Sequence, residues 1–390
     1  MSPERYALIA CRGGPVRGES VAPSGFRWQE RRYDTMSRTH RTALTRADLE
    51  YELPEDRIAT SPASPRDSAR MLVVHRDDNR IEHRRVADIG NYLNQGDLLC
   101  MNDTAVLPAR LVGERADSGG RIEGLYLNSI DGLWRVRLKS NGRLRAGIRI
   151  NLSGPQGISG AMMLVERDGD GWHVEPEKGT TLEAIGHTPI PPYILKARRQ
   201  QAPSDEQDRA WYRTVFQDPD HAGSVAAPTA GFHFTPELLE QLSSKGVDQT
   251  HVTLNVGAGT FAPIATDNLE DHVMHEESWS VGADALGRIE AQSSRPGRLI
   301  AVGTTSVRVL ESLPEPLPRE PVSGTTDLMI SPPWTFRHVD GLLTNFHLPC
   351  STLLALVAAM TGLDVLMKAY SDAVQRGYRF YSYGDAMLIL

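Results

Sequence analysis

The chain has 390 residues, enough for two or three domains, and its 40% hydrophobic and 23% charged residues exclude a disordered or fibrous protein. The net charge of −7 excludes a protein covered in basic residues, so a nucleic-acid partner would have to contact a local basic patch. The three cysteines show no paired spacing, and the longest apolar run, 353–360, is too short for a membrane helix. We therefore expect a cytoplasmic protein with no membrane partner.

Residues 1–46 show little periodicity and are rich in Arg, Gly, Pro and Ser. This composition favours a flexible N-terminal tail. A transit peptide is the alternative, but the interspersed Glu4, Glu19 and Glu30 are atypical of one. Met36 is a second candidate for the start of translation.

Residues 47–108 predict the first part of an α/β domain. Residues 47–59 combine acidic and apolar residues at helix-like spacing, interrupted by a proline, and 69–76 read "ARMLVVHR", which is typical of a buried strand. Residues 97–111 predict two short strands around an Asn-Asp-Thr turn. A polar tip between neighbouring strands is a usual place to hold a ligand.

Residues 109–190 predict a small antiparallel all-β barrel inserted into that domain, because short alternating runs are separated by Gly, Asn and Asp. Asn141-Gly142 predicts a tight hairpin turn. Side chains alternate along a strand, so the basic residues of 134–139 share one face. This basic face and the loop after it form the candidate nucleic-acid patch, with a solvated strand face as the alternative. The patch residues are Arg135, Arg137, Lys139, Arg143 and Arg145.

Residues 191–390 predict the second part of the α/β domain. The expected strands are 250–256 and 298–303, and the expected helices are 306–313 and 351–362. Ser351 is placed to cap the start of the last helix, and Gly362 to end it.

A glycine motif follows the strand at 250–256. Gly257, Gly259 and Ala262 have the spacing of a dinucleotide-binding fingerprint, but Pro263 stands where the phosphate-binding helix should continue. A turn that brings the backbone close to a neighbour is the favoured interpretation.

Two further segments carry polar candidates. Thr304, Thr305 and Ser306 stand at a predicted helix start, where free amides bind a carboxylate or phosphate, unless the hydroxyls only cap the helix. His272 and His275 are three residues apart and would share one helix face as a metal pair. A typically spaced third ligand is missing, so proton transfer by a histidine or Glu277 is the alternative.

His233 and His347 each follow a phenylalanine, in "GFHFT" and "NFHLP", beside Thr and Pro. A single histidine in such a frame is more often structural than catalytic. Two of them at loop-to-helix junctions favour a shared pocket.

Nine blocks along the chain together resemble the S-adenosylmethionine:tRNA ribosyltransferase-isomerase family. The resemblance runs from about residue 47 to the C-terminus in the family's order, and the first 46 residues have no counterpart. The blocks are "YELPEDRIA", "NDTAVLPARL", "GHTPIPPYI", "VAAPTAGFHFT", "VTLNVGAGTFAPI", "HVMHEES", "AVGTTSVRVLES", "LLTNFHLP" and "YRFYSYGDAMLIL". The chain departs from the family's usual residues at Ala105, Asn255, Ala262 and Cys350. At the position of Cys350, the family commonly has a basic residue or glycine.

The resemblance implies an α/β domain with an inserted barrel. It also implies an enzyme that moves the ribosyl part of S-adenosylmethionine onto 7-aminomethyl-7-deazaguanine at the tRNA wobble position. The product is epoxyqueuosine, and adenine and methionine are released. S-adenosylmethionine is then a co-substrate and tRNA the partner, with no metal or prosthetic group, and we expect a monomer.

The same resemblance suggests roles for the candidates. We expect His233 to be the general base, His347 the second choice, and His275 or Glu277 the acid or relay. Thr304, Thr305 and Ser306 would hold the methionine carboxylate. The other expected substrate-binding residues are Thr229, Gly231, Gly257, Gly259, Asn345 and Asp327, the last for the ammonium or the adenine amino group.

Two rival functions remain open at this point. One is a non-catalytic tRNA-binding protein that uses the basic patch. The other is an S-adenosylmethionine-dependent methyltransferase or a nicotinamide enzyme built on the loop of Gly257 and Gly259. Release of adenine would separate the first assignment from both rivals.

Overall fold

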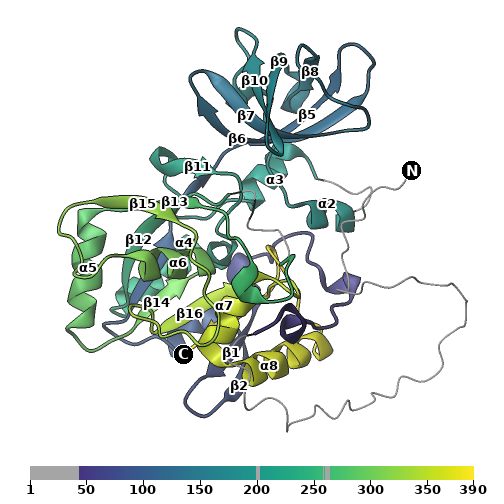
Figure 1. Cartoon of the computed structure of the whole chain (residues 1–390). Helices are drawn as coiled ribbons and strands as arrows, with labels where there is room; N and C mark the ends of the chain where they lie inside the picture. The colour runs from purple at the N-terminus through teal and green to yellow at the C-terminus, as the bar shows by residue number, and fades with distance from the viewer. Residues whose placement is uncertain (1–43, 199–202, 258, 260–263) are drawn as a thin grey trace, which may run out of the picture.

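The computed structural model describes residues 44–198, 203–257, 259 and 264–390. It consists of an α/β domain and a smaller β-barrel, which lies above that domain in Figure 1. The predicted fold class is confirmed. The expected tail at 1–46 lies mostly outside the described residues. However, Thr45 bridges to Asn268 and Arg46 donates its backbone N–H to Asp267, so 44–46 belong to the folded domain.

A nine-stranded mixed sheet forms the centre of the α/β domain. The strand order is β15 (Val322–Thr326), β13 (Glu277–Val281), β12 (Asp248–Leu254), β3 (Leu98–Asn102), β14 (Leu299–Val302), β16 (Gly341–Asn345), β17 (Ala386–Ile389), β1 (Arg70–His75) and β2 (Arg80–Arg85). The four middle strands β12, β3, β14 and β16 are parallel to one another. β13, β15 and β2 are antiparallel to their neighbours, and β17 is antiparallel to β16 and parallel to β1.

Helices cover both faces of the sheet, because alternate residues of its buried strands point to opposite sides. On β3, Leu98 and Cys100 belong to one core cluster, and Leu99 and Met101 to the other. The first cluster includes residues of α5 (Ala283–Ser293), α6 (Thr304–Ser312), α7 (Thr352–Thr361) and α8 (Leu363–Gln375), and the second includes residues of α4 (Pro236–Ser244) and the 3-10 helix η5 (Val86–Asn91).

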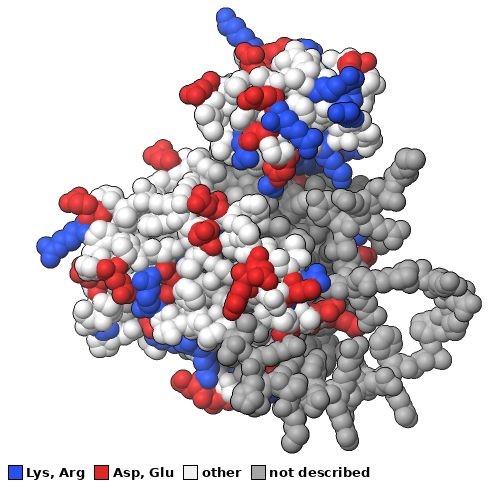
Figure 2. Space-filling model, in the orientation of Figure 1, with Lys and Arg blue, Asp and Glu red and all other residues white. Residues whose placement is uncertain are grey.

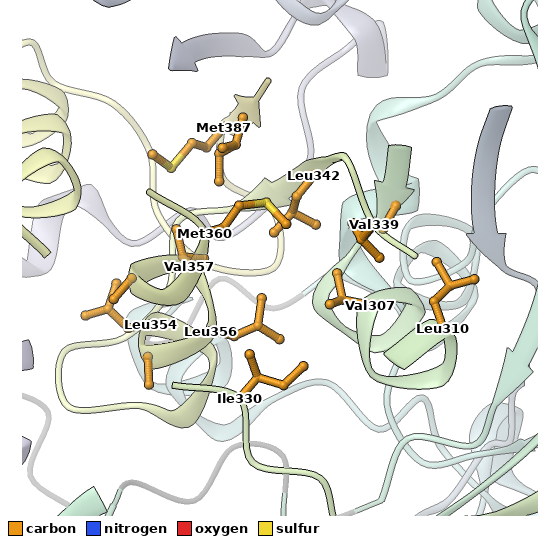
Figure 3. Packing of buried hydrophobic residues seen from close by; sticks show 14 of the residues in the cluster. Val307, Leu310, Ile330, Val339, Leu342, Leu354, Leu356, Val357, Met360 and Met387 are labelled. Atoms are coloured by element: carbon orange, nitrogen blue, oxygen red, sulfur yellow. The ribbon is translucent and has the colours of Figure 1, made fainter. Parts of the chain in front are cut away.

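Helix α7 lies in the first core. Ser351 accepts the N–H of Leu354 and caps its start, and Gly362 ends it with a φ of 80°, as the sequence predicts. Figure 3 shows Leu354, Leu356 and Met360 of this helix among the other apolar side chains of that core. Within the described part of the chain, no single helix is long and apolar enough to cross a membrane. Helices α7 and α8 meet that test only as a pair bent by 114°.

The barrel is closed, with the strand order β10-β7-β6-β5-β8-β9. Its interior holds Trp134, Val136 and Trp172, all with buried side chains. Its strands lie within the 109–190 segment expected from the sequence: β5 (Arg110–Arg115), β6 (Arg121–Ile130), β7 (Leu133–Ser140), β8 (Arg149–Ser153), β9 (Ser159–Asp168) and β10 (Gly171–Pro176).

Two local predictions are wrong. β7 pairs with β6 and β10, not with the strand after it, and neither Asn141 nor Gly142 has a positive φ. The tight hairpin turn lies before β7, at Asp131-Gly132, with φ of 51° and 83°. The helix-like spacing of 47–59 forms only the 3-10 helices η2 (Arg46–Leu49) and η3 (Glu55–Arg57), because proline separates them.

The connections between the domains carry the remaining short elements. β4 (Ala105–Val106) pairs in parallel with β11 (Ala222–Ser224), and the two chain crossings into the barrel are joined where Arg110 and His187 exchange backbone hydrogen bonds of 3.0 and 2.8 Å. The returning chain forms α1 (Leu182–Ile185), α2 (Pro192–Arg198), α3 (Asp205–Trp211), η7 (Pro219–His221) and η8 (Thr229–His233).

Gly186 tests the importance of this double crossing. A Cβ at this residue would lie 1.8 Å from the carbonyl oxygen of Pro108, so Gly186→Ala must push the two connections apart. We expect a loss of about 1–3 kcal/mol in the free energy of unfolding, measured by denaturant titration. Gly287→Ala on α5 is the matched control, because that site is open and helical, and should stabilise by about 0.5–1 kcal/mol. Equal stability of Gly186→Ala and the wild-type chain would contradict the proposed crowding.

Candidate active site

The candidate site lies at the carboxyl edge of the parallel strands. β3, β12, β14 and β16 run in one direction, so the segments that follow Asn102, Leu254, Val302 and Asn345 meet at the same edge of the sheet. Open α/β sheets bind ligands outside this edge. Helix α6 begins here after Gly303, whose φ of 90° lets the chain turn sharply from β14 into the helix.

A hollow of about 630 Å³, including its open mouth, occupies this edge. It brings together five residues predicted from the sequence: Thr229, Thr304, Thr305, Asn345 and His347. No Asp, Glu, Lys or Arg lines it among the residues that the structure describes. We call it the neutral hollow. Its rings and hydroxyls provide a surface for an uncharged, flat group.

Asn345, the last residue of β16, organises one wall of the neutral hollow. Its Oδ1 accepts the hydroxyl of Thr229 at 3.1 Å, and its Nδ2 donates to the carbonyl of Tyr381 at 3.2 Å. The same Nδ2 lies 3.2 Å from Nε2 of His233. Because the carbonyl can only accept, the amide nitrogen must face it, and the second amide hydrogen points to His233. His233 therefore presents a lone pair at Nε2 and carries its proton on Nδ1.

His233 itself lies behind the wall. Its side chain is buried at 3% exposure, and it does not line the neutral hollow. Burial lowers the pKa of His233 to about 4, a change partly opposed by Asp385. Desolvation disfavours the charged ring, so the imidazole is neutral at pH 7.

His347 lines the hollow, and its position is fixed by contacts to its backbone and its ring. Its backbone N–H donates to the hydroxyl of Tyr370 at 3.0 Å, and its carbonyl accepts the hydroxyl of Tyr51. Its Nε2 lies 2.9 Å from the hydroxyl of Thr344. Burial lowers the pKa of His347 to about 3, so this imidazole is also neutral at pH 7.

A second hollow adjoins the first, since Leu353 lines both. Four residues singled out in the sequence line it: Gly259, His272, His275 and Glu277. Glu277 forms a buried ion pair with Arg308 of α6, and its Oε1 accepts the backbone N–H of Gly257 at 2.7 Å. We call this region the charged hollow.

His272 and His275 do not lie on a helix, so they do not share a helix face. The 3-10 helix η10 (Leu269–Asp271) ends before His272, and His275 lies in a segment without regular secondary structure before β13. Burial and the neighbouring His275 lower the pKa of His272. A Cβ on Gly259 would lie 2.0 Å from the ring of His275, so the glycine permits this close approach. The described residues contain no group of three His, Cys, Asp or Glu placed to hold a metal ion.

Several candidates line neither hollow. Gly231 is packed between Phe216 and Thr214, and Ser306 donates its hydroxyl to the carbonyl of Val302. Asp327 is exposed after β15. The glycine motif is described only in part, because Ala262 and Pro263 lie outside the described residues.

The basic patch on the barrel is only partly free of acids. Arg135 pairs with Asp168 at 2.5 Å and Arg137 with Asp170 at 2.7 Å, so the β9–β10 hairpin supplies acids that the sequence of β7 alone does not reveal. Lys139, Arg143 and Arg145 are exposed. Figure 2 shows Lys and Arg side chains gathered on one side of the barrel, with acidic side chains beside them.

The residues that line the neutral hollow but were not singled out in the sequence include Tyr193, Tyr381 and Ser382. Tyr381 has a φ of 73°. The only signal in the sequence is the glycine-containing turn "YSYGD", which does not reveal that its tyrosine rather than its glycine takes the left-handed conformation. Cys350 also has a positive φ, 54°.

Comparison with known proteins gives one family. A family model described as "Queuosine biosynthesis protein" matches residues 46–389. The S-adenosylmethionine:tRNA ribosyltransferase-isomerase of Desulfitobacterium hafniense is 43% identical over 348 residues, which cover 88% of this chain and 99% of that protein. The protein of the same name from Thermotoga maritima is 42% identical with the same coverage. A crystal structure of S-adenosylmethionine tRNA ribosyltransferase from Thermotoga maritima, 35% identical, matches with a TM-score of 0.51 over 88% of this chain and 100% of the other.

The low pKa of His233 predicts how stability depends on pH. An unfolded histidine has a pKa of about 6.5, so between there and about 4 the unfolded chain binds more protons than the folded one. The stabilisation is complete above pH 6.5 and is lost as the pH falls through 4. His233→Gln keeps an acceptor for Asn345 but cannot titrate. From pH 6.5 to 5, we expect the wild-type chain to lose about 2 kcal/mol more than this variant in urea unfolding. Parallel pH curves would contradict the neutral, buried ring.

Proposed function

The chain belongs to the queuosine biosynthesis protein family, and we propose that it is an S-adenosylmethionine:tRNA ribosyltransferase-isomerase. It would transfer the ribosyl part of S-adenosylmethionine to the aminomethyl group of 7-aminomethyl-7-deazaguanine at the tRNA wobble position. The ribose is rearranged to an epoxycyclopentane, and adenine and methionine leave. This reaction needs no metal or prosthetic group.

The neutral hollow is the observation that supports this function most directly. The sulfonium of the co-substrate acidifies the hydrogens on the adjoining ribose carbon, and an uncharged imidazole can accept one of them. A site without other charges and with little water protects a reactive sulfonium and keeps an incoming amine uncharged. His347 and the hydroxyl and amide groups around it are uncharged, which supports such a site, whereas the burial that keeps the ring neutral also makes it a weak base.

The start of α6 supports a place for the methionine carboxylate. Thr304 and Thr305 line the neutral hollow at the first turn of this nine-residue helix, where the free backbone amides and the helix dipole favour an anion. Asn102 donates to the hydroxyl of Thr305 at 3.3 Å and orients it. The exposed position of Asp327 supports no contact inside this hollow.

The contacts favour His347 over His233 as the general base. The lone pair of His233 is directed at the amide of Asn345, so this ring orients the wall instead of reaching the substrate. If Nε2 of His347 donates to Thr344, its Nδ1 keeps a lone pair for proton removal. His275 and Glu277 line the adjoining charged hollow, which supports a role for one of them as acid or proton relay.

Transfer RNA is the proposed second substrate. The exposed Lys139, Arg143 and Arg145 on the barrel support contact with its phosphates, whereas Arg135 and Arg137 already have acidic partners. We propose that the protein acts as a monomer in the cytoplasm, where tRNA is available.

The histidine roles can be tested by the release of adenine from S-adenosylmethionine in the presence of tRNA that carries the deazaguanine precursor. His347→Ala should lower turnover by about 10²- to 10⁴-fold, as expected for loss of a general base. His233→Gln should lower it far less, because the acceptor for Asn345 remains. His75→Ala, in a strand at the far side of the sheet, is the control and should match the wild-type enzyme.

The same assay separates the rival functions. A larger loss of turnover in His233→Gln than in His347→Ala would identify His233 as the general base. Binding of tRNA without any adenine release would indicate a non-catalytic RNA-binding protein, and S-adenosylhomocysteine would indicate a methyltransferase.

A further inference from the structure

Tyr381 has a backbone conformation that a bulky residue rarely adopts. Its φ of 73° lies in the left-handed region, which normally requires glycine or asparagine. Three hydrogen bonds hold it there: its N–H donates to the carbonyl of Phe346 at 3.1 Å, and its own carbonyl accepts from Asn345 and from the N–H of Gly384 at 2.8 Å. Such strain persists where the surroundings over-determine it, often at ligand sites.

The strained backbone places an aromatic ring on the neutral hollow. Tyr381 and Tyr193 both line this hollow, and their rings meet edge to face with centroids 4.8 Å apart. The hydroxyl of Tyr193 is hydrogen-bonded to that of Ser382 at 2.5 Å, which fixes the second ring. The two tyrosines, here called the aromatic wall, therefore form a preorganised apolar surface.

Contacts and the strand order relate the start of α6 and the aromatic wall to Asn345, at the end of β16. Gly303, before the start of α6, lies beside Ala230, whose neighbour Thr229 is bonded to Asn345, which in turn is bonded to Tyr381. In the sheet, β14 and β17 lie on opposite sides of β16, so the start of α6, which follows β14, and Tyr381, which precedes β17, flank the strand end that carries Asn345. His347, two residues after Asn345, lines the same hollow.

We propose that the aromatic wall of Tyr381 and Tyr193 binds the adenine ring of S-adenosylmethionine. This inference rests on the proposed function. With the carboxylate at the start of α6 and the ribose at His347, adenine is the part that reaches the wall. Adenine is also the flat, uncharged part of this molecule, which suits a surface without charged side chains. Nucleobases such as adenine stack on aromatic side chains through their π-faces.

The wall is coupled to the proposed base through Asn345. The carbonyl of Tyr381 accepts from Asn345, and the N–H of Tyr381 donates to Phe346, which directly precedes His347. A shift of Tyr381 would therefore move the strand end that carries His347. The left-handed backbone at 381 positions both the adenine surface and this strand end.

Two substitutions at the same position test the wall. Tyr381→Gly keeps the left-handed backbone available but removes the ring, and Tyr381→Phe keeps the ring. We expect Tyr381→Gly to weaken equilibrium binding of S-adenosylmethionine by about 5- to 150-fold, the range that base stacking confers. Tyr381→Phe should bind within about twofold of the wild-type enzyme, because it keeps the same stacking surface. Tyr193→Leu removes the supporting ring and should also weaken binding of S-adenosylmethionine. Thermal unfolding shows whether each variant is folded, and Tyr193→Leu replaces Tyr381→Gly as the test if the glycine variant is not.

Competition with fragments identifies the part that is bound. Adenosine should displace S-adenosylmethionine from the wild-type enzyme and lose this effect in Tyr381→Gly, whereas methionine should compete equally against both. Unchanged competition by adenosine would overturn the proposal, as would a variant that binds S-adenosylmethionine normally but loses affinity for tRNA. A wild-type chain that binds no S-adenosylmethionine would instead overturn the proposed function.

Discussion

The amide of Asn345 is the contact on which the rest of the site depends. It joins Thr229 of η8, the ring of His233 and the carbonyl of Tyr381, so three segments far apart in sequence meet at the end of β16. All its hydrogens are used, and each partner accepts or donates in only one consistent arrangement. A buried network that is fully satisfied rigidifies its surroundings, whereas one broken partner leaves an unpaired polar group. The site is therefore built as one unit.

The sheet makes this convergence possible. Its four parallel strands end at the same edge, and two of them lead directly into site segments, β14 into Gly303 and α6, and β16 into His347. The strands are buried on both faces, which fixes their register because a slip of one residue would exchange the two core clusters. The scaffold thus holds the site rigidly, and the barrel is inserted in the chain between β4 and α2.

Much of this organisation can be predicted from the sequence, because periodicity and capping are local properties. Helix α7, with Ser351 and Gly362 at its ends, and the alternation that builds the barrel are of this kind. The sequence singled out His347 and Thr305, which both line the neutral hollow, whereas His233, expected to share a pocket with His347, is buried behind its wall. The features that could not be predicted depend on partners distant in the sequence. The acids opposite Arg135 and Arg137 come from another hairpin. The left-handed backbone of Tyr381 is held by hydrogen bonds to residues 345 and 346. No local pattern encodes either contact.

The separation of charge between the two hollows follows from the same physics. A charged side chain in the neutral hollow would need a partner or its own desolvation would be costly, and it would also attract water to the sulfonium. Glu277 and Arg308 avoid this cost by pairing with each other next door, and Glu277 further accepts the N–H of Gly257. The pair thereby ties α6 to β13, and α6 is the helix whose first turn faces the neutral hollow. A charge needed to hold this helix in place is kept out of the compartment that must stay dry, so the same ion pair supports the anion site and preserves the neutral one.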